Sequence, residues 1–127
     1  MATKQLDAKG KGEINYDYKD DTLLFKIKDR HYVKSIDFGD FVVDFDTEGF
    51  LTGLQFFDAS KLFKADKEAL RNIRHMEFST KVEGNIIAIQ LLFKYVRRNK
   101  EIVERGENLV RESDSPLQDR EALCTIA

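Results

Sequence analysis

The sequence feature that most constrains the fold is an alternating stretch, a turn signal and a long apolar run. Residues 76–83, MEFSTKVE, alternate apolar and polar side chains, which is the period of a β-strand. Gly84-Asn85 is typical of a two-residue hairpin turn. The run NIIAIQLLFKYV then stays apolar on both faces over about twice the usual strand length. We expect a strand buried on both sides, either between a helix and another layer or in a subunit interface.

The first half of the chain shows the same period in shorter pieces. Strands are predicted at 14–18, 23–27, 31–36, 41–46 and 50–57, with 31–36 as a short edge strand. Thr47 and Glu48 fit a hairpin loop, with Gly49 at the position that needs a positive φ. These pieces predict antiparallel hairpins.

Two segments are less regular. Apolar residues at three- and four-residue steps predict helix over 58–73, with Asp58 as N-cap, either as one helix or as two short turns with Asp66 capping the second. Residues 100–112 fit a helix, because Glu101 and Arg105 form an i,i+4 pair, or a strand interrupted at Gly106. We favour the strand.

Together these elements predict an α+β fold, with antiparallel hairpins, a short helical segment near 58–73 and a second antiparallel meander. We expect a flexible N-terminal arm at 1–12, a single domain at 13–112 and a C-terminal tail at 113–127. Within the domain, 14–64 is the first part and 75–112 is a β extension.

Composition excludes several classes. The 127 residues carry a net charge of −2, so no global positive field recruits nucleic acid or a membrane. Cys124 is the only cysteine, so no intrachain disulfide or cysteine-based zinc site is expected, and we interpret it as a spare thiol in the tail. The polar start lacks the apolar core of a signal peptide, and no run is long enough to span a membrane. We expect a cytoplasmic protein without a cofactor.

A set of residues between Tyr16 and Leu62 is similar to a known pattern: tyrosine-aspartate, a further aspartate before a strand, an acidic hairpin with glycines, and aspartate-alanine-serine. The matching residues are Tyr16, Asp17, Asp21, Leu23, Leu24, Asp44, Asp46, Gly49, Gly53, Phe57, Asp58, Ala59 and Ser60. Through these residues, the first half of the chain resembles the small prokaryotic domain-of-unknown-function family 2283. Leu24-Phe25 and Gln55 depart from the pattern, since the family usually has glutamate at the latter position.

The resemblance implies a small β-rich unit with a helix after the hairpin, and no established activity. It also leaves open an antitoxin-like role, because members are sometimes thought to lie beside toxin-like genes. The second β segment lies outside the resemblance.

The stretch DFDTEGFLTGLQ has the outline of a calcium loop, with Asp44, Asp46, Glu48 and Gly49 in the expected places. Its flanks alternate with the strand period, whereas a calcium loop lies between two helices. Gln55 also stands where a bidentate glutamate is needed. We therefore interpret the stretch as a β-hairpin and keep Asp44 and Asp46 only as candidates for a loose cation contact.

Acid–base chemistry is an alternative. Asp17, Asp20, Asp21, Asp44 and Asp46 would cluster if the first strands are neighbours, which would suit a small metal-dependent hydrolase. Turn-forming and capping aspartates are the simpler interpretation. His31, His75 and Ser60 have no sequence companions that would make them catalytic, and capping explains Ser60.

The stretch KYVRRNK carries four basic residues around a predicted hairpin tip: Lys94, Arg97, Arg98 and Lys100. Beside Tyr95, such a tip suits phosphate contact and base stacking, so a nucleic-acid-binding or antitoxin-like regulator is a second alternative. Acidic residues follow at once, and a solvated turn explains the same charges.

The long apolar strand gives the first hypothesis: a non-enzymatic protein that acts through protein–protein contacts, as a homodimer. An exposed apolar strand must be paired or covered, and a twofold dimer is the commonest solution. The expected interface residues are Ile87, Ile89, Leu91, Leu92 and Phe93. Leu92→Asp is expected to abolish folding or assembly.

Overall fold

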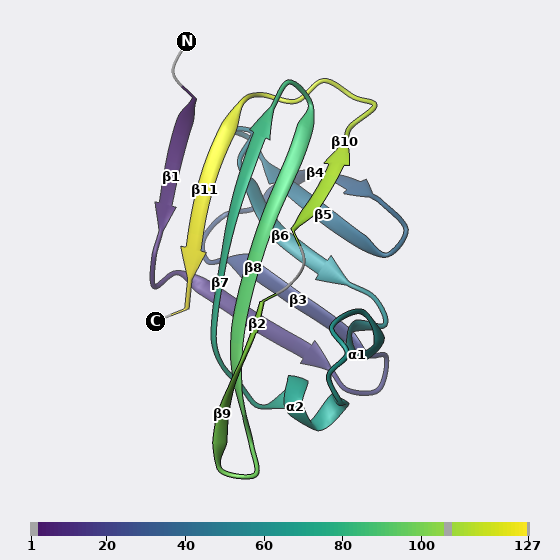
Figure 1. The fold of residues 1–127 in the computed structure, drawn as a ribbon. Helices are drawn as coiled ribbons and strands as arrows, with labels where there is room; N and C mark the ends of the chain where they lie inside the picture. Colours follow the sequence, from purple (N-terminus) through teal and green to yellow (C-terminus); the bar gives the residue numbers. More distant parts are fainter. Residues whose placement is uncertain (1–2, 106–107, 127) are drawn as a thin grey trace.

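The computed structural model describes residues 3–105 and 108–126 as two facing β-sheets (Figure 1). The first sheet has the order β1-β11-β7-β8-β10, with β9 also paired to β8. Its strands are β1 (Lys4–Ala8), β7 (Ile73–Glu83), β8 (Ile86–Arg97), β9 (Lys100–Arg105), β10 (Leu109–Glu112) and β11 (Arg120–Thr125). The second sheet has the order β2-β3-β6-β5-β4. Its strands are β2 (Gly12–Asp17), β3 (Thr22–Ile27), β4 (Tyr32–Asp37), β5 (Phe41–Asp46) and β6 (Leu51–Phe56).

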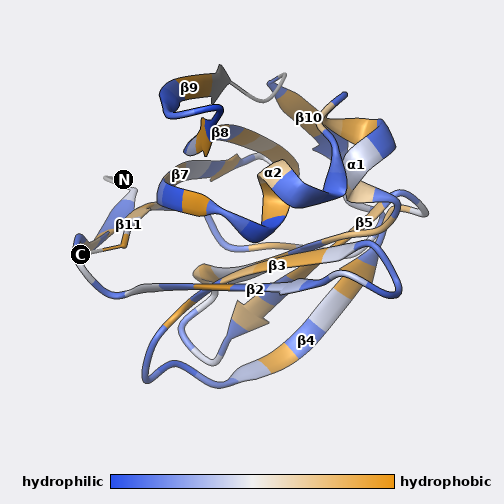
Figure 2. Cartoon of the chain, turned by 90° about the horizontal axis from the view of Figure 1, so that it is seen from below, coloured by the Kyte–Doolittle hydropathy of each residue, from blue (hydrophilic) through white to orange (hydrophobic). Residues whose placement is uncertain are grey.

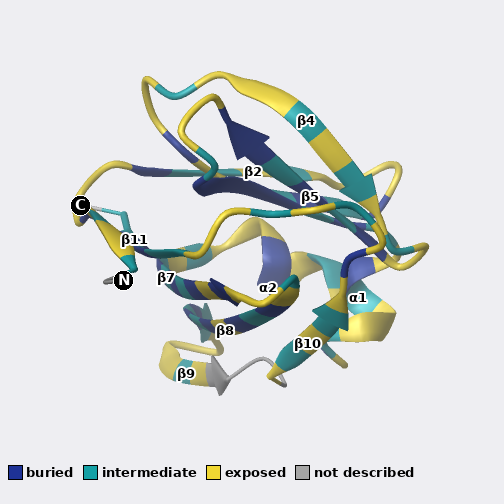
Figure 3. Cartoon of the chain, turned by 90° about the horizontal axis from the view of Figure 1, so that it is seen from above, coloured by how far each residue is buried: buried dark blue, intermediate teal, exposed yellow. Residues whose placement is uncertain are grey.

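The strands predicted from the alternation of apolar and polar side chains are found, with bounds that differ by three residues or fewer. The pairs β2–β3, β5–β6 and β7–β8 are antiparallel hairpins. Gly84 and Asn85 have φ of 58° and 67°, the positive values that a two-residue hairpin turn of this kind requires. The strand expected at 31–36 is β4, which lies at the edge of the second sheet and is largely exposed (Figure 3).

The predicted α+β class is wrong, because the described residues form two β-sheets with only two very short helices. The helical segment is two short pieces, α1 (Ala59–Leu62) and α2 (Lys67–Arg71), which lie at one end of the two sheets (Figure 2). Of the two alternatives for 58–73, the two short turns are found and the single helix is wrong. Lys64, with φ of 52°, breaks the helical path between the two pieces.

Asp66 caps α2 as expected, accepting a hydrogen bond from the Ala69 backbone N–H at 2.8 Å. The cap expected from Asp58 is wrong. Asp58 has left-handed backbone dihedrals (φ 48°, ψ 46°), and its side chain makes no capping hydrogen bond. Its backbone carbonyl accepts from Lys61 and Leu62 instead.

The expected flexible arm at 1–12 and tail at 113–127 each contain a strand among their described residues, β1 in the first and β11 in the second, which corrects that interpretation there. β1 pairs in parallel with β11, with Lys4 opposite Arg120 and Ala8 opposite Cys124. β11 in turn pairs with β7. Cys124 is therefore a buried core residue rather than a spare tail thiol.

The segment 100–112 is extended where the structure describes it, as β9 and β10, so the favoured strand interpretation is confirmed there and the helix is wrong. The expected interruption at Gly106 lies outside the described residues. β9 pairs with residues 92–97 of β8, and β10 pairs with residues 86–89, so the two share one side of β8.

Aromatic side chains from both sheets build one core between them. Phe93 of β8 lies 6.5 Å from Phe25 of β3 and 5.2 Å from Phe63, between ring centroids. Phe63 also meets Phe56 of β6 edge to face at 5.1 Å. The core thus joins the family-like part to the β extension. Among the described residues, no helix is long and apolar enough to cross a membrane.

Candidate functional site

Three residues of the family pattern, Tyr16, Asp21 and Ser60, form a hydrogen-bonded cluster around the buried carboxylate of Asp21, which we call the clasp. Asp21 is 7% exposed and lies in the turn between β2 and β3 with φ of 56°. The Tyr16 hydroxyl donates to its Oδ1 at 2.6 Å, and the Ser60 hydroxyl donates to its Oδ2 at 2.5 Å. The Ser60 backbone N–H also donates to this carboxylate, at 3.1 Å from Oδ1.

This clasp supplies the cap that Asp58 does not. Asp21 takes the Ser60 N–H of the first turn of α1, and the Asp21 backbone carbonyl accepts from the Ala59 N–H at 2.9 Å. A carboxylate from a turn 39 positions earlier therefore begins the helix. Asp21, Ser60 and Tyr16 fix α1 to the end of the β2–β3 hairpin.

The clasp holds its two titrating groups in their usual charge states. Burial, followed by the hydrogen bond to Asp21, raises the pKa of the Tyr16 hydroxyl well above its ordinary value. Burial opposes ionisation of Asp21, but hydrogen bonds from Ser60 and Tyr16 outweigh it and hold the pKa of Asp21 below its ordinary value. Tyr16 is therefore a donor, and Asp21 an ionised acceptor.

The acidic hairpin is a second built feature, and each aspartate has its own partner. Asp46 Oδ1 accepts from the backbone N–H groups of Glu48 and Phe50, at 2.9 and 3.0 Å. Its Oδ2 lies 2.6 Å from Nη1 of Arg30. Gly49 has φ of 85°, so the hairpin with glycine at the turn is confirmed. Asp46 closes this loop.

Asp44 points elsewhere. Its Oδ1 accepts from the Ser35 hydroxyl of β4 at 2.5 Å. Gly53, opposite it on β6, leaves room for this carboxylate, because a Cβ there would lie 3.1 Å from Asp44 Oδ2. The carboxylates of Asp44 and Asp46 are thus already bound by other groups of the same chain. The described residues contain no group of three or more His, Cys, Asp or Glu side chains arranged to hold a metal ion.

Of the other candidates for acid–base chemistry, Asp17 and Asp20 lie together in the β2–β3 turn, and the two histidines lie at different sheets. Asp17 accepts from the backbone N–H groups of Lys19 and Asp20 in the β2–β3 turn. His75 lies 3.6 Å from Glu77 on the first sheet, whereas His31 is exposed beside β4. Burial raises the pKa of the Cys124 thiol to about 12, which keeps it protonated.

The basic tip lies where it was expected, on a hairpin that extends beyond the rest of the sheet (Figure 1). Arg98 and Asn99 form its turn, with φ of 53° and 62°. Arg97 lies 3.6 Å from Asp66, the N-cap of α2, and Lys94 lies 4.0 Å from Glu101 of β9. Lys100 begins β9 and is exposed.

The expected interface residues divide between the two faces of β8. Ile87, Ile89, Leu91 and Phe93 are buried in the protomer's own core, at 4% exposure or less. Leu92 lies on the opposite face and is half-buried. The second sheet thus covers the inner face of β8. The outer face of the first sheet has no such cover among the described residues.

This outer face keeps apolar side chains in contact with solvent. Ile86, Val103 and Val110 are 48%, 47% and 53% exposed, from β8, β9 and β10 respectively. Val110 is opposite Ala88, and Val103 is opposite Lys94, so both point to the outer face. A concavity of about 560 Å³ lies on the same face, over Ala88, Gln90, Ser79 and Leu123. Alternation in the sequence separates the two faces of a strand but does not say which face remains exposed. The exposed fractions of these side chains identify this surface.

The part of the chain that matches a known protein family contains both the clasp and the acidic hairpin. Residues 13–60 match the model of a family described as protein of unknown function, DUF2283. An uncharacterized protein of Methanocaldococcus jannaschii is 35% identical over 97 residues, which cover 76% of this chain and 84% of that protein. The chain belongs to this family.

A second relative, named a putative hypoxanthine phosphoribosyltransferase of Methanosarcina mazei, is 29% identical over 94 residues. These cover 74% of this chain and 76% of that protein. No solved structure matches the chain. The DUF2283 match ends at residue 60, which is the serine that closes the clasp on Asp21. The family pattern in this chain therefore marks residues that hold a turn, a helix and a hairpin together.

Proposed function

We propose that this DUF2283 protein acts without catalysis, through protein–protein contact, as a homodimer joined by the outer face of its first sheet. The observation that carries the proposal is the exposure of Ile86, Val103 and Val110 on one sheet face. Apolar residues exposed singly are ordinary, but three on neighbouring strands of one sheet face favour an interaction surface.

The size of this face suits a stable dimer. β7 and β8 have 11 and 12 residues, but β1, β11 and β10 have only 5, 6 and 4, so the sheet is long only at its centre. At roughly 3.3 Å per residue and about 4.8 Å between strands, the strands of this sheet cover on the order of 700 Å². This area is near the roughly 800 Å² that each partner contributes to a standard interface.

Charge at the two ends of the face favours a second copy as the partner. Glu112 of β10 and Glu83 of β7 lie opposite Ile86 from its two sides at one end of β8, and Glu83 also pairs with Lys81 at 3.2 Å. Lys94 lies toward the other end, where its exposed pair with Glu101 at 4.0 Å is weak. A twofold axis near Gln90 brings the acidic end of one copy over Lys94 of the other. The two copies are then self-complementary.

The test is the mass in solution of Leu92→Asp against wild type. Because Leu92 is on the outer face, an aspartate there leaves the core intact and places an uncompensated charge in the interface. Light scattering should give twice 14.7 kDa for wild type and 14.7 kDa for Leu92→Asp, with unchanged circular dichroism. Val33→Asp, at a 63% exposed apolar residue on β4, is the matched control and should stay dimeric. A monomeric wild type at 0.1 mM contradicts the proposal.

The activity in the name of the Methanosarcina mazei relative is not proposed for this chain, because no feature of the described residues favours it specifically.

A further inference from the structure

We propose that one end of the molecule binds single-stranded nucleic acid, with phosphates held by the β8–β9 tip and a base stacked at Tyr18. This basic end comprises Tyr18, Lys19, Lys67, Arg71, Arg74, Arg97, Arg98 and Lys100. The inference goes beyond dimer formation and does not depend on it, because the tip extends past the outer face along the direction of β8.

The tip presents cations that the protein does not use. Arg98 and Lys100 are exposed, and they lie in and beside a turn at the far end of a projecting hairpin (Figure 1). Among the described residues, no ion pair engages Arg74, Arg98 or Lys100. Free cations on a projecting hairpin are placed to contact a phosphate backbone without displacing any internal partner.

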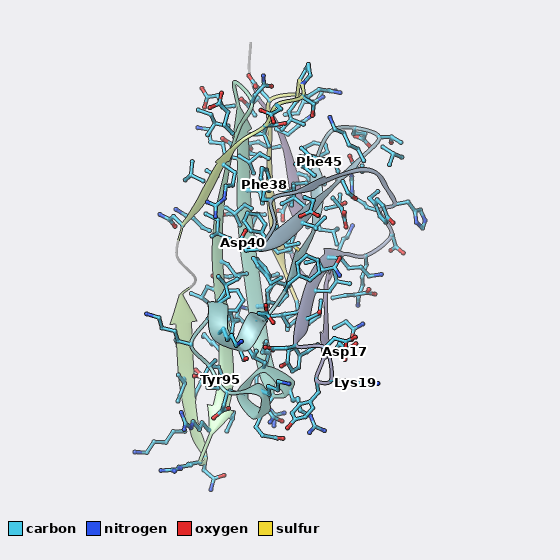
Figure 4. The ribbon with its side chains drawn as sticks, turned by 90° about the vertical axis from the view of Figure 1, so that its right-hand side faces the viewer. Asp17, Lys19, Phe38, Asp40, Phe45 and Tyr95 are labelled. Atoms are coloured by element: carbon cyan, nitrogen blue, oxygen red, sulfur yellow. The ribbon has the colours of Figure 1, made fainter. Side chains whose placement is uncertain are left out.

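A stacking platform lies at the same end. Tyr18 is 44% exposed in the β2–β3 turn. The Arg71 guanidinium carbon is 4.8 Å from its ring centroid, and the Lys67 Nζ is 5.3 Å from it. Lys67 also donates to the Tyr18 backbone carbonyl at 3.2 Å, which fixes the turn to α2. Figure 4 shows Lys19 of this turn and Tyr95 of β8 at one end of the molecule.

Local charge at this end differs in sign from that of the whole chain. Seven basic side chains stand against five acidic ones, Asp17, Asp20, Asp66, Glu68 and Glu101, whereas the whole chain has a net charge of −2. Asp66 and Glu68 are already engaged by Arg97 and Arg71, at 3.6 and 3.2 Å. Among the described residues, the cations of this end without an ion pair are therefore Lys19, Arg74, Arg98 and Lys100.

The aromatic ring decides between single-stranded and duplex nucleic acid. Aromatic faces and arginine planes stack on unpaired bases, which a duplex keeps inside its own stack. Phosphate contacts alone would not distinguish single-stranded from duplex nucleic acid. The Tyr18 ring, held beside Arg71, adds a stacking contact that only an unpaired base can make. The proposed ligand is accordingly single-stranded RNA or DNA, bound without strict sequence preference.

The experiment measures fluorescence anisotropy of a labelled 12-nucleotide RNA of mixed sequence, with a 12-base-pair duplex of the same sequence as the comparison. Arg98→Glu/Lys100→Glu should weaken binding about tenfold at 50 mM salt, and should reduce the slope of log K against log salt by about 1.4, for two lost phosphate contacts. Lys4→Glu/Lys28→Glu is the matched control. It makes the same charge change at exposed lysines of β1 and of the opposite end of the β2–β3 hairpin.

Tyr18→Leu tests the stacking contact, with Tyr18→Phe as its control. The leucine variant should bind the RNA on the order of tenfold more weakly, and the phenylalanine variant should match wild type. A thermal melt of each variant separates this loss from unfolding. Equal weakening by the two charge-reversal variants, equal binding of duplex and RNA, or no wild-type binding at 0.1 mM protein would overturn the proposal.

Discussion

The Ser60 hydroxyl lies 2.5 Å from Oδ2 of Asp21, a residue 39 positions earlier in the chain. This one contact joins the turn of the β2–β3 hairpin to the start of α1. The Tyr16 hydroxyl completes the arrangement from the other side of the same carboxylate. A buried carboxylate with three donors is stabilising only while all its partners are present.

Asp21→Ala should therefore lower the free energy of unfolding by about 2–4 kcal/mol, because it leaves the Tyr16 hydroxyl and the Ser60 donors without an acceptor and places alanine at a positive φ. Asp20→Ala, in the same turn but exposed and without such contacts, should change it by less than about 0.5 kcal/mol. Urea unfolding at pH 7 measures both. Equal effects would show that the clasp adds no stability.

The clasp also predicts a pH dependence of defined sign. The pKa of Asp21 is lower in the folded protein than its ordinary value of 3.8, so its contribution is full above that value and is lost as pH falls through the folded pKa. The difference in unfolding free energy between wild type and Asp21→Asn should be largest at neutral pH and should shrink below pH 3.8. The same difference for Asp20→Asn should stay small throughout. A gap between wild type and Asp21→Asn that is constant from pH 6 to pH 3 contradicts this account.

Gly12 should be intolerant of a side chain, although its φ is ordinary. A Cβ there would lie 3.0 Å from Cys124 Sγ and 3.1 Å from the Thr125 carbonyl carbon. Gly12→Ala should cost about 1–3 kcal/mol of stability through overpacking. Cys124→Ala removes the Sγ contact but not the backbone contact, so the double variant should recover only part of the loss, with a coupling of about 0.5 kcal/mol or more. If the stability losses of Gly12→Ala and Cys124→Ala simply add in the double variant, the alanine at position 12 does not clash with Cys124 Sγ.

Truncation after Ser113 should abolish cooperative unfolding. It removes β11, which lies between β1 and β7, and leaves β1 without its partner. It also removes Arg120, whose Nε donates to the Glu48 carbonyl at 2.8 Å and whose guanidinium contacts the Phe50 ring. Circular dichroism with a urea titration checks this. A truncated chain that unfolds with the full-length midpoint would show that the C-terminal strand is dispensable.

The strands that alternation predicted are those whose own side chains specify a face. Residues 76–83 and 86–97 carry enough apolar residues at period two to determine their burial, and the register of β7 on β8 follows from the turn at Gly84-Asn85. The helix spacing was less decisive, because a short apolar spacing is satisfied by α1 and α2 separately and does not require one continuous helix.

What the sequence could not show depends on partners far along the chain. The sequences of β1 and β11, KQLDA and REALCT, show little alternation. β1 pairs with β11 across 116 positions, and β11 also pairs with β7. The helix cap was assigned to Asp58 because it is adjacent to α1, whereas the structure uses Asp21. The apolar run of β8 indicated burial on both faces but did not say which face the protomer covers itself.

The parallel pairing of β1 with β11 has a consequence for synthesis on the ribosome. Lys4 emerges early, but its partner Arg120 is made 116 residues later, which takes roughly 6–23 s at about 5–20 residues per second. Once β7 is made, it too lacks its neighbour on that side until β11 follows. The nascent chain therefore has open strand edges at β1 and then at β7 until β11 is translated, and any factor that shields such edges acts within those seconds.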